Sequence, residues 1–174
     1  MFLPLQAQRY SVGTNIISYA NFLTLNAEMQ AALSQKWSVA AAARYNPWTF
    51  NKNRPGIDHL QSRQLTFAAG ARFWPWHVYS GWFFGAKAQY TKYNWGGITS
   101  PKTYEGDIIG ANLSFGYSLM LTSRWNIDFG AGILVGHNRY DKYACPKCGE
   151  RLENDKKEIY VGPESILVQI SYLF

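Results

Sequence analysis

The sequence predicts an all-β fold, an eight-stranded antiparallel up-and-down transmembrane β-barrel. Three observations lead to this prediction. Apolar residues alternate with small or polar residues in eight separate segments, which is typical of strands with one face in a hydrophobic medium. Aromatic residues make up 17% of the 174 residues and charged residues only 16%, against about 25% charged in typical soluble domains. No stretch approaches the ~18 apolar residues that a transmembrane helix needs.

The first four predicted strands show this alternation along the N-terminal half of the chain. They cover residues 10–18, 23–33, 37–45 and 65–73. In the first, Val12, Thr14 and Ile16 share one face. In the second, every odd-numbered position is apolar, from Leu23 to Leu33. In the third and fourth, odd positions are again apolar, while even positions are small or polar.

The last four predicted strands repeat the pattern. They cover residues 82–91, 109–119, 125–136 and 166–174. In 82–91 the apolar face is on even positions, and in 109–119 and 125–136 it is on odd positions. The final segment alternates from Ile166 and ends on Phe174. A terminal aromatic suits a barrel strand, because aromatic girdles lie at the membrane–water boundary.

The predicted connections alternate between short and long. Short ones cover residues 34–36, 75–80 and 122–124, and long ones cover 46–62, 94–103 and 138–159. Only the first hairpin, near residues 19–21, is short at the other end. Outer-membrane barrels have short periplasmic turns and long extracellular loops. We therefore expect periplasmic termini and extracellular long loops, with 9–174 as the barrel domain and 1–8 as a signal-peptide remnant or a disordered N-terminus.

The alternation alone does not decide which face meets lipid, because a soluble lipocalin-type barrel has its apolar face inward. Two observations favour a membrane barrel. The small and polar face is rich in Gly and Ala, which suits a narrow interior. The pairs Trp37/Tyr45 and Trp82/Tyr90 bracket apolar rows eight residues apart, or about 20 Å at ~3.3 Å per residue and a tilt of roughly 40°.

Six charged residues are expected to face the interior. They are Glu28, Arg44, Arg72, Lys87, Asp128 and Glu164, the last at the outer end. Three acids match three bases, and unpaired charges in a narrow interior are costly. We therefore expect an ion-pair network, with a polar ion path as the alternative. Since an eight-stranded barrel is only wide enough for its own side chains, the network and a barrel without a pore are favoured.

Cys145 and Cys148 lie in the longest predicted loop. A local disulfide is the favoured interpretation, because secretion exposes the loop to oxidising conditions. A zinc site is less favoured, because zinc needs four ligands and only His137 offers a third. A redox-active pair is the remaining alternative. No cofactor is predicted.

The net charge of +6 comes largely from loops and rims. Basic loops outside a barrel predict contact with lipopolysaccharide phosphates, and this location argues against a nucleic-acid partner. Four loop aromatics are candidate contacts for a glycan or protein partner, with packing onto the barrel as the alternative: Trp48, Trp95, Tyr140 and Tyr143.

Enzymatic activity is not expected. Hydrolysis of lipid would need a nucleophile beside an oriented histidine. The chain has only His59, His77 and His137, and His137 is followed by Asn138 rather than by serine. The expected function is a structural or interaction role, in which the outer loops contact lipopolysaccharide or a surface-assembly or fimbrial partner. An outer-membrane enzyme that modifies lipid A is the alternative function.

Several motifs together resemble a known family. They are Tyr45-Asn46-Pro47-Trp48, the hairpin Gly116-Tyr117…Arg124-Trp125, Tyr140-Asp141-Lys142-Tyr143…Cys148-Gly149, and Tyr160-Val161-Gly162-Pro163. The chain resembles an uncharacterised outer-membrane β-barrel family of the Bacteroidota, classed as a domain of unknown function. The resemblance implies an outer-membrane location, in some cases near fimbrial or surface-adhesin loci, and it carries over no catalytic residues. Glu164-Ser165 and Phe73-Trp74 depart from the family's usual pattern.

Overall fold

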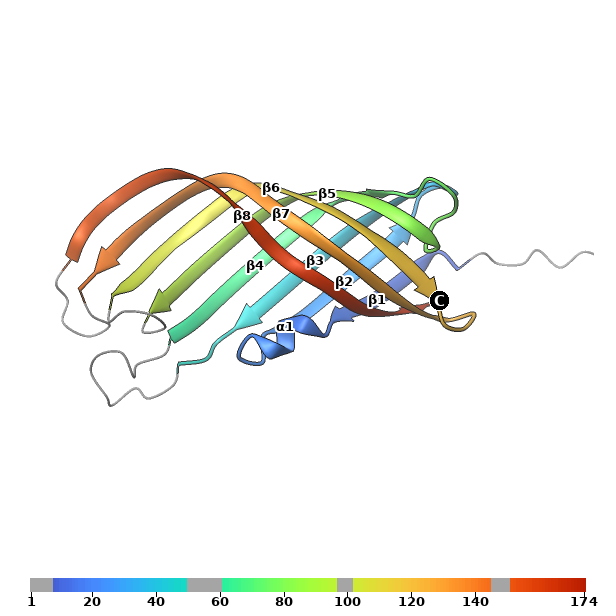
Figure 1. The fold of residues 1–174 in the computed structure, drawn as a ribbon, viewed down its shortest axis with the longest axis horizontal. Coiled ribbons are helices and arrows are strands. Elements are labelled where there is room, and N and C mark those ends of the chain that lie inside the picture. The colour runs from blue at the N-terminus through green and yellow to red at the C-terminus, as the bar shows by residue number, and fades with distance from the viewer. Residues whose placement is uncertain (1–7, 50–60, 97–101, 145–150) are drawn as a thin grey trace, which may run out of the picture.

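The computed structural model describes residues 8–49, 61–96, 102–144 and 151–174. Eight antiparallel strands, each paired with the next along the chain, form a closed barrel (Figure 1). The strands are β1 (Tyr10–Asn15), β2 (Leu25–Ala32), β3 (Trp37–Asn46), β4 (Gln61–Phe73), β5 (Gly81–Gly96), β6 (Thr103–Met120), β7 (Trp125–Tyr143) and β8 (Arg151–Leu173). The predicted eight-stranded antiparallel barrel is confirmed.

The pairing of β1 with β8 closes the sheet. The Tyr10 amide donates to the Phe174 carbonyl at 3.1 Å, the Phe174 amide donates back at 2.9 Å, and the two rings stack with centroids 6.0 Å apart. A sheet closed in this way has no open edge. The start of β1 and the end of β8 lie at the same end of the barrel as the short connections 33–36, 74–80 and 121–124 (Figure 1). We call this the turn end and the opposite one the wall end.

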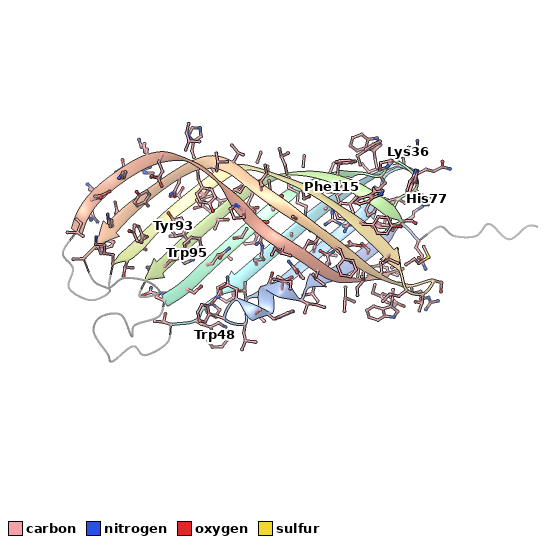
Figure 2. The ribbon with its side chains drawn as sticks, viewed as in Figure 1. Lys36, Trp48, His77, Tyr93, Trp95 and Phe115 are labelled. Carbon is pink, nitrogen blue, oxygen red and sulfur yellow. The ribbon has the colours of Figure 1, made fainter. Side chains whose placement is uncertain are left out.

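The two faces of the sheet differ in polarity. Along β7, residues at odd positions from Trp125 to Val135 point outward, while Asn126 and Asp128 are buried inside. The same holds on β6, where Phe115 points away from the barrel (Figure 2). Large apolar side chains are exposed on the outer surface, as Met29 (60%) and Ile166 (66%) show.

The predicted strand over 10–18 is wrong beyond Asn15. The short helix α1 (Ile17–Ala20) follows instead. Asparagine side chains replace the strand ladder here: Asn26 Oδ1 accepts from the Asn15 amide at 2.6 Å, and Asn15 Oδ1 accepts from the Ile17 amide at 3.1 Å. Such local side-chain bonds offer the backbone an alternative to continued pairing. Within the described ranges, no helix has the length and apolar character needed to cross a membrane.

The predicted loop over 138–159 is also largely wrong, because β7 continues to Tyr143 and β8 begins at Arg151. The predicted loop over 94–103 is shortened in the same way by β5 and β6. Beyond the apolar band the outward residues are charged and the inner face of β5–β7 carries large aromatic residues, so an apolar outward face no longer marks a strand, although backbone pairing continues. These extensions rise past β1–β3 at the wall end (Figure 1). We call residues 92–96, 103–107, 139–143 and 151–157 the tall wall.

Apolar side chains fill the barrel at the turn end. This apolar plug consists of Trp74, Val78, Tyr79, Phe83 and Leu173. Trp74 and Phe83 are fully buried, and their ring centroids lie 5.1 Å apart. The Trp74 indole N–H donates to Ser38 Oγ at 3.0 Å, so its polar group is satisfied despite burial. The plug occupies the cross-section of the barrel between the turn end and the charged residues of the interior.

Candidate functional site

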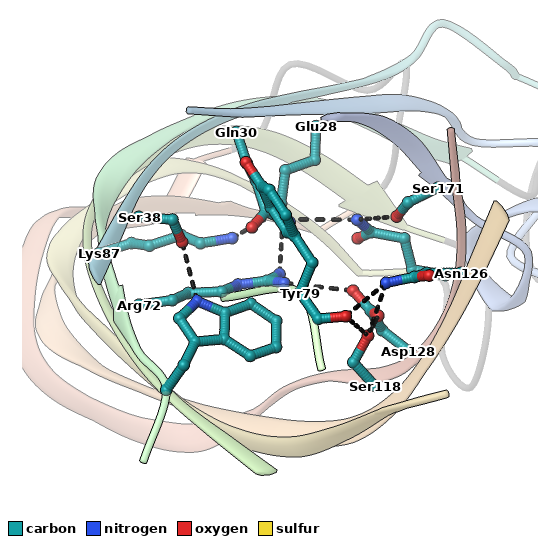
Figure 3. Close-up of polar contacts among 12 residues, drawn as sticks. Glu28, Gln30, Ser38, Arg72, Tyr79, Lys87, Ser118, Asn126, Asp128 and Ser171 are labelled. Carbon is teal, nitrogen blue, oxygen red and sulfur yellow. Dashed lines mark hydrogen bonds and ion pairs between the residues drawn. The ribbon is translucent and has the colours of Figure 1, made fainter. Parts of the chain in front are cut away.

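Arg72 is the centre of the barrel interior (Figure 3). Its side chain is 1% exposed. One guanidinium nitrogen lies 2.5 Å from Glu28 Oε1, and the other lies 3.3 Å from Asp128 Oδ2. The guanidinium carbon also lies 4.6 Å from the centroid of the Phe83 ring, a favourable cation–π contact. Arg72 therefore joins two acids to the apolar plug.

Glu28 brings in the second base. Its Oε2 forms an ion pair with Lys87, and its Oε1 accepts a hydrogen bond from Gln30 at 3.0 Å. Two acids and two bases thus lie in contact inside the barrel. Their charges cancel, so the cost of removing each from water is offset by the others and by the surrounding amides. We call Glu28, Arg72, Lys87 and Asp128 the charge network.

The charge network is tied to the turn end through hydroxyl and amide groups. Ser118 Oγ donates to Asp128 Oδ1 at 2.6 Å, and Asn126 Nδ2 donates to the Tyr79 carbonyl at 2.6 Å (Figure 3). Tyr79 has φ +67°, a left-handed conformation that is costly for a bulky residue. Buried hydrogen bonds from Ser118 and Asn126 to the Tyr79 carbonyl hold this residue of the connection between β4 and β5 inside the barrel.

The other two predicted charges form a separate pair. Arg44 and Glu164 form an ion pair nearer the wall end. A cavity of about 60 Å³ lies between this pair and the charge network, lined in part by Ala42, Ala68 and Gly132. At ~10–15 Å³ per water, it is large enough for a few water molecules only. The six predicted interior residues therefore divide into a group of four and a pair.

The inner face of the tall wall carries an aromatic cluster instead of charges. Tyr93, Ile108, Leu134 and Tyr140 are buried together, with Trp95 and Tyr104 packed beside them (Figure 2 labels Tyr93 and Trp95). The Tyr93 hydroxyl donates to Asn138 Oδ1 at 2.7 Å. Burial raises the pKa of Tyr93 to about 12, although the hydrogen bond to Asn138 lowers it. The tall wall is therefore packed as an ordered extension of the sheet.

Ion pairs join β7 to β8 across the outer part of the tall wall. Lys142 and Lys156 each lie 3.0 Å from a carboxylate oxygen of Glu153. Their hydrogen bonds lower the pKa of Glu153. Arg139 pairs with Asp155 on the same hairpin. Exposed pairs of this kind contribute little individually, but several together fix the register of the hairpin.

The four predicted loop aromatics lie in different environments. Trp48 is 43% exposed beside β2, and its indole N–H donates to the Leu23 carbonyl at 3.4 Å. Trp95 and Tyr140 are packed into the aromatic cluster of the wall. Tyr143 is half-buried, with the Arg151 guanidinium carbon 5.6 Å from its ring centroid. Only Trp48 is presented freely for contact with a partner.

The remaining candidates do not form a reactive centre among the described residues. His77 lies at the turn end, where Nδ1 is 3.0 Å from the Val78 carbonyl oxygen, and His137 points outward on β7. No group of three metal-ligating side chains occurs in the part of the chain that the structure describes. Cys145, Cys148 and His59 lie outside the described residues.

Phe83 is an interior residue that the alternation pattern did not identify. It pairs across the sheet with Gly116, and a Cβ atom at Gly116 would lie only 2.5 Å from the Phe83 ring. The glycine therefore makes room for the aromatic side chain. A single large residue on a face of small residues, in register with a glycine on the next strand, is the signal that would have found it.

The strand order and the filled interior define the class: a closed eight-stranded antiparallel β-barrel with an ion-paired core. The chain belongs to the family described as "Protein of unknown function (DUF3575)", whose model matches residues 1–174. No curated protein and no solved structure matches the chain.

Replacing Arg72 by Met is expected to lower the free energy of unfolding by about 3–5 kcal/mol, because Asp128 loses its buried partner. Adding Asp128→Asn should recover most of this loss, since Glu28 and Lys87 still neutralise each other. Urea unfolding in detergent or lipid measures both effects. Arg124→Met, at an exposed position of the turn end, is the matched control and should change stability by less than about 0.5 kcal/mol. An Asp128→Asn change that deepens the loss would contradict the network.

Proposed function

We propose that this barrel lies in a bacterial outer membrane, is closed to ions, and uses its wall end to contact lipopolysaccharide or a protein of a surface assembly. The observation that carries the proposal is a band of uncharged outward side chains that ends abruptly in a row of charges. The edge of the band toward the wall end is one cross-strand row, which consists of Tyr90, Ile109, His137 and Ile159. The next row toward the wall end is charged at every position and consists of Lys92, Asp107, Arg139 and Lys157.

The height of the uncharged band supports a membrane location. Outward residues on β7 are uncharged from Trp125 to Val135, a separation of ten residues. At ~3.3 Å per residue and a tilt of roughly 40°, ten residues cover about 25 Å, the height of the apolar band in outer-membrane barrels. Exposed side chains such as Ile109 (59%) would form a large apolar patch in water, whereas acyl chains solvate them.

The interior supports a barrel without a pore. The apolar plug and the charge network occupy successive levels, and Trp74, Arg72 and Phe83 are each at most 1% exposed. An eight-stranded barrel leaves no further width for an aqueous channel. Reconstituted protein is therefore expected to give no stepwise conductance in a planar bilayer, and regular stepwise openings would overturn this part of the proposal.

The tall wall supports a role in interaction. Its strands are paired and packed, so it offers a rigid surface above the lipid headgroups. The alternative role, an enzyme that modifies lipid A, has weaker support. His137 lies at the edge of the band, but it has no hydrogen-bonded hydroxyl among the residues that the structure describes. We therefore place interaction first.

An arginine in the middle of the outward band tests the membrane location. Ala131→Arg, midway between Trp125 and His137 on β7, is expected to cost roughly 2–4 kcal/mol of folding free energy in lipid, because the charge meets acyl chains. His137→Arg, in the row at the edge of the band, should cost only about 0–1 kcal/mol. Folding titrations in lipid vesicles measure both variants. Equal costs for the two would contradict a lipid-facing band.

Charge reversal on the tall wall tests the interaction role. Arg151→Glu with Lys156→Glu is expected to remove a protein partner that co-purifies from membranes, because it reverses exposed basic groups at the wall end. Lys36→Glu with Arg124→Glu makes the same charge change at the turn end and should retain the partner. Quantitative affinity purification compares the two. Retention by the first variant, or loss by both, would contradict a role for the wall.

A further inference from the structure

The outward face of β2–β5 is recessed at the level of the middle of the band. One cross-strand row there consists of Met29, Ala41, Ala69 and Ala88. Three of these four side chains end at Cβ, so the surface lies closer to the backbone than it does around Phe84 and Phe115, which pair across β5 and β6. We call this row, together with Ala27 and Ala43 beside it, the alanine recess.

The recess contains two adjoining hollows. One, of about 590 Å³, reaches Phe67 and Tyr90 toward the wall end. The other, of about 760 Å³, reaches Tyr10 and Phe174 at the turn end. Both are lined by Met29, Ala41 and Ala69, so they form one elongated apolar groove across the band. Each volume is within the ~300–1,000 Å³ typical of ligand sites, and the long apolar shape suits acyl chains.

A polar hollow lies directly above the groove. It has a volume of about 330 Å³ and is lined by Tyr45, Arg63, Lys92, Asn94 and Glu105, among others. Register places it next to the groove, since Leu65 pairs with Lys92 in the row immediately above Phe67 and Tyr90. A ligand with an acyl chain in the groove would therefore have its headgroup in the polar hollow.

The charges of the polar hollow favour an anionic headgroup. Neither Arg63 nor Lys92 forms an ion pair with a residue that the structure describes, whereas Arg139 and Lys157 on β7 and β8 both pair with Asp155. With Glu105 included, the three charged side chains of the hollow keep a net positive charge. A phosphate between Arg63 and Lys92 would form charge-assisted hydrogen bonds with both.

An unpaired amide oxygen points to a sugar next to that phosphate. Asn94 Oδ1 is buried and has no hydrogen-bond partner among the described residues, and Asn94 lines the polar hollow. A buried acceptor without a donor is costly, and a sugar hydroxyl would supply the donor. An unpaired acceptor beside two bases suits a phosphorylated glycolipid, whose sugar carries hydroxyl donors, better than a phospholipid without a hydroxyl in its headgroup.

We propose that one lipopolysaccharide molecule docks on β2–β5, with an acyl chain in the alanine recess, a phosphate between Arg63 and Lys92, and a sugar hydroxyl on Asn94 Oδ1. This inference rests on the proposed outer-membrane location and assigns its lipid contact to one site. A second copy of the chain fits less well. Two copies with the same orientation in one membrane would meet about a two-fold axis along the membrane normal, which would bring like charges at Arg63 and Lys92 to the same level.

The test uses the full chain, purified in detergent and incubated with purified lipopolysaccharide, with bound lipid measured after gel filtration. Arg63→Gln with Lys92→Gln is expected to weaken binding by about tenfold or more, because it removes two charge-assisted contacts. Arg139→Gln with Lys157→Gln removes the same charge from the neighbouring face and should bind as the unmodified chain does.

A second pair of variants tests the groove without changing charge. Ala69→Phe fills the recess and should also lose binding. Ala131→Phe, at an exposed outward position on β7 outside the recess, should not. Equal binding by the Arg63/Lys92 and Arg139/Lys157 variants would overturn the site. Disulfide cross-linking of two copies of an Ala41→Cys variant would also overturn it, because a second copy would then occupy the groove. Cell fractionation tests the proposed function separately. A chain that is absent from the outer membrane fraction would contradict the proposed function, whereas a chain that is present there but does not bind lipopolysaccharide would contradict only this site.

Discussion

A closed sheet has only two faces, and in the middle of this barrel large apolar side chains point outward while charged and small ones point inward. Closure fixes the register, because each strand pairs on both sides and a slip of one residue would turn every side chain of that strand to the other face. The narrow interior then accepts only small residues and a few large ones in matched positions, such as Phe83 opposite Gly116. Most of the large apolar side chains point outward.

The interior is stable because its charged and apolar parts share residues. Arg72 contacts two carboxylates and the Phe83 ring, so the charge network and the apolar plug form one packed unit. A core of this kind fills the barrel at two successive levels. The outer surface and the wall end carry the features on which the proposals rest, namely the alanine recess, the bases Arg63 and Lys92, and the tall wall.

Sequence reasoning was reliable where one strand face meets a single environment. The alternation from Trp125 to Val135 is complete, and β7 was placed correctly over those residues. It failed over 138–159, because outward residues there are charged instead of apolar, so the alternation that marked the strands ends while the backbone pairing continues. It also failed after Asn15, where side-chain hydrogen bonds end the strand. Charge balance predicted a network, but the separation of Arg44 and Glu164 from Arg72 depends on register across the sheet, which a single strand does not reveal.

The orientation of the two faces is most directly measured by spin labels placed one at a time along residues 125–141 in a lipid bilayer. Collision with oxygen reports acyl chains, and collision with a water-soluble nickel complex reports water. Odd positions up to Val135 are expected to favour oxygen, odd positions beyond His137 the nickel complex, and even positions are expected to be shielded from both. Odd positions within the band that favour the nickel complex would contradict the lipid-facing surface on which the rest depends.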